Sequence, residues 1–270
     1  MKILVTGHNG FIGSHLFKKL EELGHDVTGF STKEGDICKY DDVEKFVKDK
    51  DAVFHLAGMS RMSEAQLSPN KAFESIYSGT ENVAKACEYY HAKVIYTSTN
   101  QVYGDGVVPT VENVPLRPVN MYGSYKMMAE MLLSPSDFIA RLGNVYGPSE
   151  KSHSVVNRFI DKIKNDVTIR IYNNLRLTRD FVYIDDVVDA LVLGIDNFGI
   201  YNIGSGVETS IGELLDKISK ILKKEYKTVN MDRVIYPEVL KVWLDIQKIR
   251  MLGWEPKVNL DEGIRRCIDG

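Results

Sequence analysis

The feature that most constrains the fold is a set of three glycines, Gly7, Gly10 and Gly13, placed directly after an apolar run. Residues Lys2–Thr6 have the composition of a short buried strand, and Phe11–Leu23 has the periodicity of an amphipathic helix. Glycine lets the chain turn sharply between the two and leaves the amides at the helix N-terminus open to a phosphate. The start of the chain therefore predicts a strand–turn–helix unit that cradles a dinucleotide.

Strand-like and helical patterns continue to alternate through the first half of the chain. We expect strands at Asp26–Ser31, Asp51–Leu56, Lys93–Ser98 and Phe138–Arg141, and helices at Asp41–Lys48, Phe73–Tyr90 and Tyr122–Leu133. Short buried strands separated by helices indicate a parallel sheet with right-handed crossovers. The fold class expected is α/β, a Rossmann-like doubly wound parallel sheet.

The pattern changes after Pro148, which indicates a smaller C-terminal α/β lobe that binds substrate. Helices are expected at Val155–Lys164, Asp186–Leu193, Ile211–Lys223 and Leu260–Ile268, with short strands at Thr168–Tyr172 and Phe181–Ile184. We expect residues 1–148 to form the dinucleotide-binding domain, with a strand and helix added from about 176–203. Residues 149–270 would form mainly the substrate-binding lobe.

Composition excludes several classes of function. The formal net charge of −3 argues against nucleic-acid binding, which depends on cation–phosphate contacts. The three cysteines are far apart and form no CxxC pair, so we expect neither a disulfide framework nor a metal site. No apolar run approaches the length of a signal peptide or a membrane span, so the expectation is a cytoplasmic protein without a membrane partner.

Tyr122 and Lys126 are four residues apart in a predicted helix, so their side chains share a face. An ammonium beside a phenol favours the phenolate, and such a pair can move a proton while a hydride moves elsewhere. Tyr89 and Lys93 have the same spacing, but they span the end of a helix and the start of a strand. We interpret that second pair as chance.

These motifs resemble the extended branch of the short-chain dehydrogenase/reductase superfamily, which contains NAD(P)-dependent sugar-nucleotide epimerases, dehydratases and reductases. The resemblance runs along nearly the whole chain. It is carried by the TGxxGxxG turn, the hydroxyl residues before Val102-Tyr103-Gly104, the YxxxK pair, and residues 141–148 and 178–187. It implies a homodimer joined through the helices Phe73–Tyr90 and Tyr122–Leu133.

The resemblance also implies a set of cofactor-binding residues: Gly7, Asn9, Gly10, Phe11, Ile12, Ser31, Thr32, Lys33, Asp36, Ile37, Leu56, Ala57, Gly58, Thr97, Tyr122, Lys126 and Leu142. Members that prefer NAD usually carry an acid at the position of Ser31. A hydroxyl pair and Lys33 could instead accept a 2′-phosphate, so we expect NADP(H), with NAD(H) as the alternative. In that alternative Lys33 is a solvated loop cation.

The catalytic residues implied are Thr99, Tyr122 and Lys126. Tyr122 would be the acid and base, Lys126 would lower its pKa and hold the cofactor, and Thr99 would orient the sugar oxygen. The substrate, a nucleotide-diphosphate sugar, would contact Ser98, Thr99, Asn100, Asn144 and Arg179. Arg179 would bind the diphosphate; alternatively, it pairs internally with Asp180 or Asp185.

Residues after Thr99 separate the activities of the family. The 4,6-dehydratases carry an Asp-Glu pair there, whereas this chain has Asn100 and Gln101, whose amides cannot exchange protons near neutrality. We therefore expect an epimerase acting at C4 through a transient 4-keto sugar. The alternatives are an NADPH-dependent 4-ketoreductase, then a 4,6-dehydratase or a noncatalytic dinucleotide-binding protein.

Several positions depart from the family pattern and leave the sugar and nucleobase open. The usual glycine-rich turn is Asn173-Asn174-Leu175, and Ile76 stands where asparagine is typical. Pro237-Glu238 replaces a Gly-acid pair, with Arg233 displaced from the expected arginine position.

Overall fold

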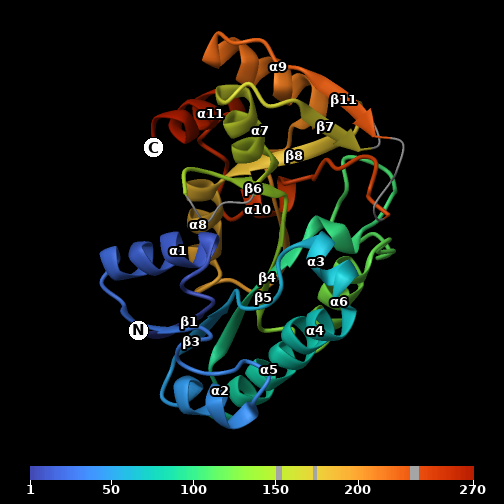
Figure 1. Ribbon diagram of the computed structural model, residues 1–270. Helices are drawn as coiled ribbons and strands as arrows, with labels where there is room; N and C mark the ends of the chain where they lie inside the picture. Colours follow the sequence, from blue (N-terminus) through green and yellow to red (C-terminus); the bar gives the residue numbers. More distant parts are fainter. Residues whose placement is uncertain (150–153, 173–174, 232–236) are drawn as a thin grey trace.

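The computed structural model describes residues 1–149, 154–172, 175–231 and 237–270, and its centre is a six-stranded parallel sheet (Figure 1). The strand order is β2-β1-β3-β4-β5-β9. The strands are β1 (Lys2–Thr6), β2 (Asp26–Phe30), β3 (Ala52–His55), β4 (Lys93–Thr99), β5 (Phe138–Leu142) and β9 (Gly199–Ile203). The order reverses between β1 and β3, and ligands of doubly wound sheets bind beside such a switch point. The expected fold class is confirmed.

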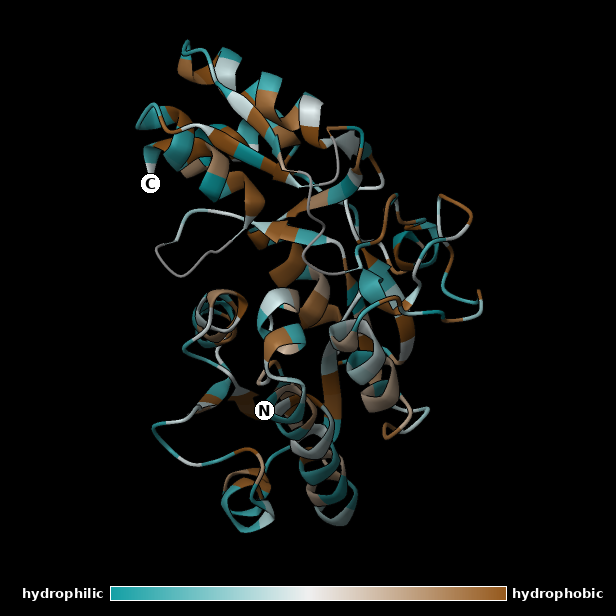
Figure 2. Cartoon of the chain, turned by 45° about the vertical axis from the view of Figure 1, so that its right-hand side comes forward, coloured by the Kyte–Doolittle hydropathy of each residue, from teal (hydrophilic) through white to brown (hydrophobic). Residues whose placement is uncertain are grey.

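Helices cover both faces of this sheet. They are α1 (Phe11–Glu22) and α8 (Ile184–Leu193) on one face, and α2 (Tyr40–Val47), α5 (Gly79–Tyr90) and α6 (Met121–Glu130) on the other (Figure 1). Ile3 and Val5 of β1 pack into the first hydrophobic layer, and Leu4 packs into the second. Because side chains alternate across a strand, burial of both faces produces the continuous apolar runs seen in the sequence and in Figure 2.

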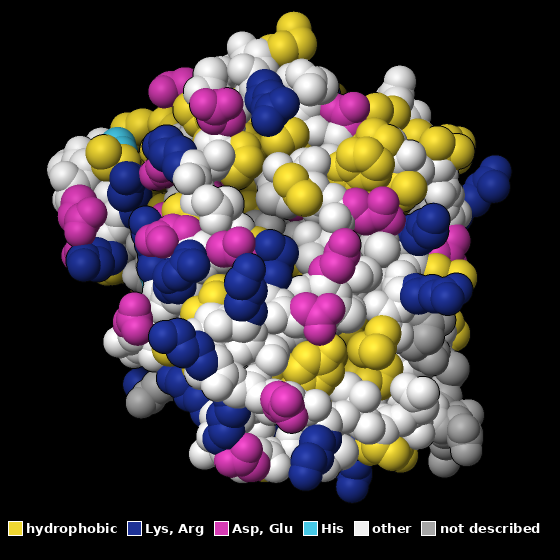
Figure 3. Space-filling model, turned by 90° about the horizontal axis from the view of Figure 1, so that it is seen from above, with side chains coloured by type: hydrophobic (Ala, Val, Ile, Leu, Met, Phe, Trp, Pro, Cys, Tyr) yellow, Lys and Arg dark blue, Asp and Glu magenta, His cyan; other side chains and the backbone are white. Residues whose placement is uncertain are grey.

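The rest of the chain forms a smaller lobe with two short sheets. One contains β6 (Asn144–Tyr146), β8 (Thr178–Tyr183) and β10 (Glu208–Ser210), and the other pairs β7 (Ile169–Tyr172) with β11 (Thr228–Met231). The helices are α7 (Val155–Lys164), α9 (Ile211–Leu222), α10 (Gln247–Arg250) and α11 (Leu260–Asp269). Charges of both signs mix over the face seen in Figure 3. Lys217 on α9 forms a 2.7 Å ion pair with Asp261 on α11.

The structure divides the helix predicted at Phe73–Tyr90. Two short helices, α3 (Met62–Leu67) and α4 (Pro69–Phe73), lead into a π-helical turn, η1 (Glu74–Ser78), and α5 begins only at Gly79. Such turns are frequent at functional sites. Here the turn carries Ser75, whose hydroxyl accepts a hydrogen bond from the Met59 amide at 3.2 Å and lines the cavity described below.

The strand predicted at Phe181–Ile184 is also displaced. β8 begins at Thr178 and ends at Tyr183, and Ile184 is already the first residue of α8. All six residues of β8 are buried, so the strand has no alternation of apolar and polar residues to mark its start.

Candidate active site

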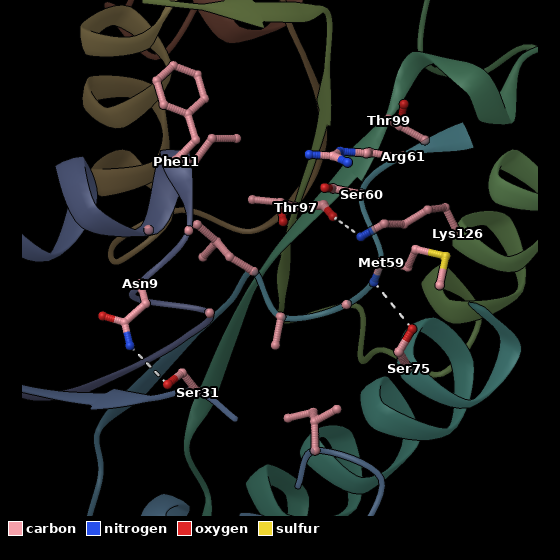
Figure 4. Close-up of a pocket in the computed structure, with 18 of the residues that line it drawn as sticks. Asn9, Phe11, Ser31, Met59, Ser60, Arg61, Ser75, Thr97, Thr99 and Lys126 are labelled. Carbon is pink, nitrogen blue, oxygen red and sulfur yellow. Dashed lines mark hydrogen bonds between the residues drawn. The ribbon is translucent and has the colours of Figure 1, made fainter. Parts of the chain in front are cut away.

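A cavity of about 650 Å³ opens at the carboxyl ends of the parallel strands (Figure 4). It is lined by every residue that the sequence assigns to the cofactor except one: Gly7, Asn9, Gly10, Phe11, Ile12, Ser31, Thr32, Asp36, Ile37, Leu56, Ala57, Gly58, Thr97, Tyr122, Lys126 and Leu142. The exception is Lys33, which is exposed and does not line the cavity. One space therefore runs from the glycine turn to the end of β4.

The glycine turn has the shape of a phosphate cradle. Gly7 has a φ of +74°, and the Gly10 amide donates to the Gly7 carbonyl at 2.9 Å. A Cβ atom at Gly13 would overlap that carbonyl, so only glycine lets α1 start this close to β1. Helix α1 has no side-chain cap and no acid in its first turn, which leaves its N-terminal amides suited to an anion. The residues present fit a dinucleotide.

A buried histidine at the end of β3 links three elements next to the site. His55 Nε2 lies 3.0 Å from the Thr80 hydroxyl, and Nδ1 lies 2.8 Å from the Thr6 hydroxyl. Thr80 donates its own hydrogen to the Ile76 carbonyl, so His55 Nε2 carries the ring proton. Burial lowers the pKa of His55 to about 3, and the nearby Lys126 adds to the shift. The ring is therefore a neutral link between β1, β3 and α5.

Helix α6 places Tyr122 and Lys126 beside the end of β4. The Asn120 side chain caps the helix by accepting from the Gly123 amide at 2.9 Å, which sets where the helix begins. The Lys126 ammonium donates to the Thr97 carbonyl at 2.8 Å and lies 4.6 Å from the centre of the Tyr96 ring. In Figure 4 this lysine extends from α6 towards β4.

Burial shifts the two catalytic candidates in opposite directions. It raises the pKa of Tyr122 to about 12, an effect partly offset by a hydrogen bond with Thr99. It lowers the pKa of Lys126 to about 8, opposed by the Glu130 carboxylate one turn later. The Lys126 ammonium donates to the Thr97 carbonyl, and the hydrogen bond with Thr99 is the contact that favours the phenolate in this structure. That Lys126 lowers the pKa of Tyr122 stays a prediction.

The second YxxxK pair is separated by the fold. Tyr89 lies exposed on α5, while Lys93 begins β4 and donates to the carbonyls of Ile195 and Asn197 at 3.0 and 2.7 Å. The two side chains have different surroundings, as expected of a chance repeat of the spacing.

A chain of amides joins the ends of β4 and β5 to the start of α6. Asn100 donates to the Leu142 carbonyl at 3.0 Å, and Gln101 donates to the Asn100 side-chain oxygen at 2.7 Å. The Asn120 amide in turn donates to the Gln101 side-chain oxygen at 3.2 Å. The residues that replace an acid pair after Thr99 thus hold the helix that carries Tyr122.

A second cavity of about 510 Å³ adjoins the first and shares Thr99 and Tyr122 with it. Asn100 and Asn144, both assigned to the substrate from the sequence, line this cavity. The side-chain oxygen of Asn144 is buried and has no hydrogen-bond partner within the described structure, which suits it to a ligand. Ser98 lines the first cavity only.

Sequence reasoning missed two arginines of this second cavity. Arg61 follows β3 and lines both cavities, and Arg158 lies on α7 and lines the second. Figure 4 shows Arg61 beside Thr99 and Ser60. No spacing motif marks either residue, because each reaches the site only through the fold of a loop or a distant helix.

Arg179 has a different place from the one expected. It is buried and lines neither cavity, and its guanidinium pairs with Glu238 and donates to the Val239 carbonyl at 3.0 Å. The alternative partners Asp180 and Asp185 are also wrong: the buried carboxylate of Asp180 accepts from Ser205, Gly206 and Leu244 instead. Of the other departures, residues 173–174 and Arg233 lie outside the described residues, and Ile76 is buried in η1.

A buried ion pair lies next to the end of β4 and bonds to it through Ser98. Arg141 on β5 binds both carboxylate oxygens of Glu130 on α6, with a closest approach of 2.7 Å. Ser98 donates to the same carboxylate, and Arg141 also donates to the Tyr103 hydroxyl at 3.1 Å. The pair ties α6, which carries Tyr122 and Lys126, to β5 and to β4, which ends at Thr99.

Metal ligands and membrane-spanning helices are both absent from the described residues. These residues contain no cluster of three or more His, Cys, Asp or Glu side chains that could hold a metal. Within the same part of the chain, every helix is too short or too polar to cross a membrane.

Residues 3–204 match the NAD dependent epimerase/dehydratase family. The chain belongs to this family. It is 33% identical to a putative UDP-glucose 4-epimerase of Methanocaldococcus jannaschii over 99% of this chain and 97% of that protein. It is 30% identical to human dTDP-D-glucose 4,6-dehydratase over 99% of this chain and 89% of that protein.

The UDP-glucose 4-epimerase of Thermus thermophilus, solved with NAD, superposes with a TM-score of 0.89 at 26% identity, covering 100% of this chain and 98% of that one. The family thus includes more than one reaction.

Proposed function

We propose that the protein is an NAD(P)-dependent epimerase of nucleotide-diphosphate sugars that acts at C4 through a transient 4-keto sugar. The observation that carries the proposal is the position of Thr99 and Tyr122, which line both cavities at their junction. A dinucleotide held by the glycine turn and a sugar held in the second cavity would meet at these two hydroxyl groups. The structural relative solved with NAD is itself named a UDP-glucose 4-epimerase, which supports the same reading.

The residues would divide the reaction as follows. A bound nicotinamide dinucleotide supplies a hydride acceptor and, once reduced, a hydride donor. Tyr122 as phenolate would take the proton of the C4 hydroxyl as that carbon is oxidised to the ketone, and it would return the proton when the ketone is reduced from its other face. Thr99 hydrogen-bonds the reacting oxygen and stabilises the phenolate. Lys126 fixes the end of β4 through the Thr97 carbonyl.

Dehydration is disfavoured because it needs an acid and a base beyond the tyrosine. Asn100 and Gln101 are amides, which do not exchange protons near neutrality, and each donates a hydrogen bond within the protein, to the Leu142 carbonyl and to the Asn100 side-chain oxygen respectively. An NADPH-dependent 4-ketoreductase would use the same three catalytic residues and remains the rival. Net consumption of reduced cofactor separates the two.

The test begins with a thermal-stabilisation screen of UDP-, GDP-, dTDP- and CDP-sugars in the presence of each dinucleotide. The stabilising sugar is then incubated with the enzyme, and its C4 epimer is followed by NMR. We expect epimer without stoichiometric loss of cofactor, and the Tyr122→Phe variant should lose at least about 10²-fold in kcat. Stoichiometric oxidation of the reduced cofactor by a 4-keto sugar would instead support the reductase.

A matched control exists in this chain. Tyr89→Phe removes a phenol hydroxyl from the other YxxxK pair, at an exposed position on α5, and should leave kcat unchanged. Sugar binding that survives Tyr122→Phe, with no turnover by the wild type on any sugar, would favour a noncatalytic dinucleotide-binding protein.

We also propose a homodimer joined through α5 and α6. Light scattering should then give twice the 30.5 kDa mass of one chain, and a value for a single chain would contradict the dimer.

A further inference from the structure

A guanidinium group lies at the junction of the two cavities, and the proposed reaction gives it no role. Arg61 lies between β3 and α3 and lines both cavities, as Thr99 and Tyr122 do. Figure 4 shows its side chain beside Thr99. A positive charge therefore lies close to the two hydroxyl groups at which the sugar would react.

The backbone on each side of Arg61 is attached to the rest of the site. Before it, the Met59 amide donates to the Ser75 hydroxyl at 3.2 Å. After it, the Met62 sulfur accepts from the side-chain amide of Asn120 at 3.5 Å. Asn120 also caps α6, the helix that carries the catalytic tyrosine. The position of Arg61 is thus tied to the start of that helix.

The guanidinium already binds a carboxylate in this structure. Arg61 Nη1 donates to Glu64 Oε1 at 2.5 Å, and the two side chains are 42% and 47% exposed. The Nε and Nη2 groups of Arg61 make no hydrogen bond to any described residue. An exposed ion pair of this kind contributes little to stability, so a carboxylate from a ligand can replace that of Glu64. The planar fork of arginine matches a carboxylate with two parallel hydrogen bonds.

The charge of the second cavity favours an anion. Among the residues that the structure describes, its lining contains Arg61 and Arg158 and no aspartate or glutamate. Charges of one sign in the wall of a cavity attract ligands of the other sign. The remaining question is which negative group of a substrate would lie beside Arg61.

The arrangement of a nucleotide sugar answers this question. In the proposed function, Thr99 and Tyr122 hold the oxygen on C4. The diphosphate is attached to C1, across the sugar ring from C4, and the pyrophosphate of a dinucleotide would lie at the glycine turn before α1. C5 is bonded directly to C4. A carboxylate on C5 is therefore the anion that would lie beside Arg61.

Such a carboxylate needs a cation next to it. Tyr122 acts as a phenolate in the proposed function, and a second negative charge nearby would oppose its ionisation. The Arg61 guanidinium would offset this charge at the junction that all three groups share. With a neutral hexose, the same guanidinium would have no charged partner on the sugar.

We propose that Arg61 makes this site select nucleotide-diphosphate sugars with a carboxylate on C5, the hexuronic acids, over neutral hexoses. The inference rests on the proposed function, because Thr99 and Tyr122 are taken to place C4. It adds the class of sugar and the residue that recognises it.

The test compares UDP-glucuronic acid with UDP-glucose, which differ only at C6, and the corresponding pairs on the other nucleobases. Binding to the full chain is measured by isothermal titration calorimetry with saturating NAD⁺, and epimer formation is followed by NMR. Wild type should bind the hexuronic acid at least about tenfold more tightly than the hexose, the effect of one hydrogen-bonded charge.

The variants assign this preference to one side chain. Arg61→Gln should lower the preference about tenfold, by weakening the binding of the hexuronic acid and not that of the hexose. Arg61→Lys, which keeps the charge without the planar fork, should restore part of it. Arg170→Gln, the same change at an exposed position on β7, should leave the preference unaltered.

Two results would overturn the inference alone: a wild type that binds UDP-glucose as tightly as UDP-glucuronic acid, or a preference that Arg61→Gln leaves unchanged. Equal losses for both sugars in Arg61→Gln are of the second kind, since they would indicate a contact with the diphosphate. Selective binding that depends on Arg61, without epimer formation, would keep the inference and overturn the proposed function. Circular dichroism of each variant checks that the fold is retained, as we expect of exposed side chains.

Discussion

Replacement of Glu130 by alanine should be among the most damaging single changes near the site. The carboxylate and the Arg141 guanidinium are 5% and 3% exposed, so neither has water to replace the other. Removal of one partner of a buried pair costs about 3–5 kcal/mol, because it leaves an uncompensated charge. The Ser98 hydroxyl loses its acceptor at the same time.

This loss converts to a measurable shift in melting temperature. With an unfolding entropy of roughly 2.1 cal/mol/K per residue, a chain of 270 residues should melt roughly 5–9 °C lower. Calorimetry of Glu130→Ala measures this directly. Glu22→Ala removes an exposed pair with Lys18 at 3.7 Å and should shift the midpoint by less than about 1 °C.

A double-mutant cycle with Arg141→Met tests the cause. If the cost comes from an unpaired buried charge, the double variant Glu130→Ala/Arg141→Met should be more stable than the sum of the two single losses predicts. Additive losses, or a shift in Glu130→Ala no larger than that of the surface control, would refute the reasoning.

Three further changes test the cavity. Burial lowers the pKa of Lys126 from 10.5 to about 8. This shift reduces the free energy of unfolding by roughly 3 kcal/mol below pH 8 and has no effect above pH 10.5, so the stability of the wild type should rise with pH across this window. Melting curves of Lys126→Met should lack that gain. Gly13→Ala should lose dinucleotide binding in calorimetry, whereas Gly106→Ala, with open space around it, should keep it. Asn120→Ala and Asn259→Ala remove equivalent helix caps, each worth about 1 kcal/mol, but turnover assays should show lower kcat only for Asn120→Ala.

The parts of the fold that the sequence predicted well have strong local signals. The bounds of β1 and α7 were predicted without error, because an apolar run before glycine and a 3.6-residue period each depend on adjacent residues. The glycine turn is equally local: Gly7 takes a positive φ, and Gly13 leaves room for the Gly7 carbonyl, because neither has a side chain. Most of the cavity lining could therefore be listed from motifs.

What the sequence could not supply is the partner of each charged side chain. Arg179 pairs with Glu238 across 59 positions, and Lys126 bonds a backbone carbonyl that no side-chain motif records. Glu34 is close to Ser31 in sequence, yet its hydrogen bond with the Ser31 hydroxyl depends on a turn that folds the acid back onto the strand end. Local patterns place residues near a site, whereas long-range pairing decides which charges remain available there.

The side-chain amides near Tyr122 provide long-range pairing of this kind. Thr99, Tyr122 and Leu142 come from three elements, and each could shift independently if only the hydrophobic core held them. The hydrogen bonds through Asn100, Gln101 and Asn120 fix these elements to one another with neutral groups. Neutral links add no charge beside Tyr122, so the pKa of the phenol is governed by burial and by Thr99. An Asp-Glu pair in place of Asn100 and Gln101 would put negative charge beside the phenol, and that charge would oppose ionisation of the phenol.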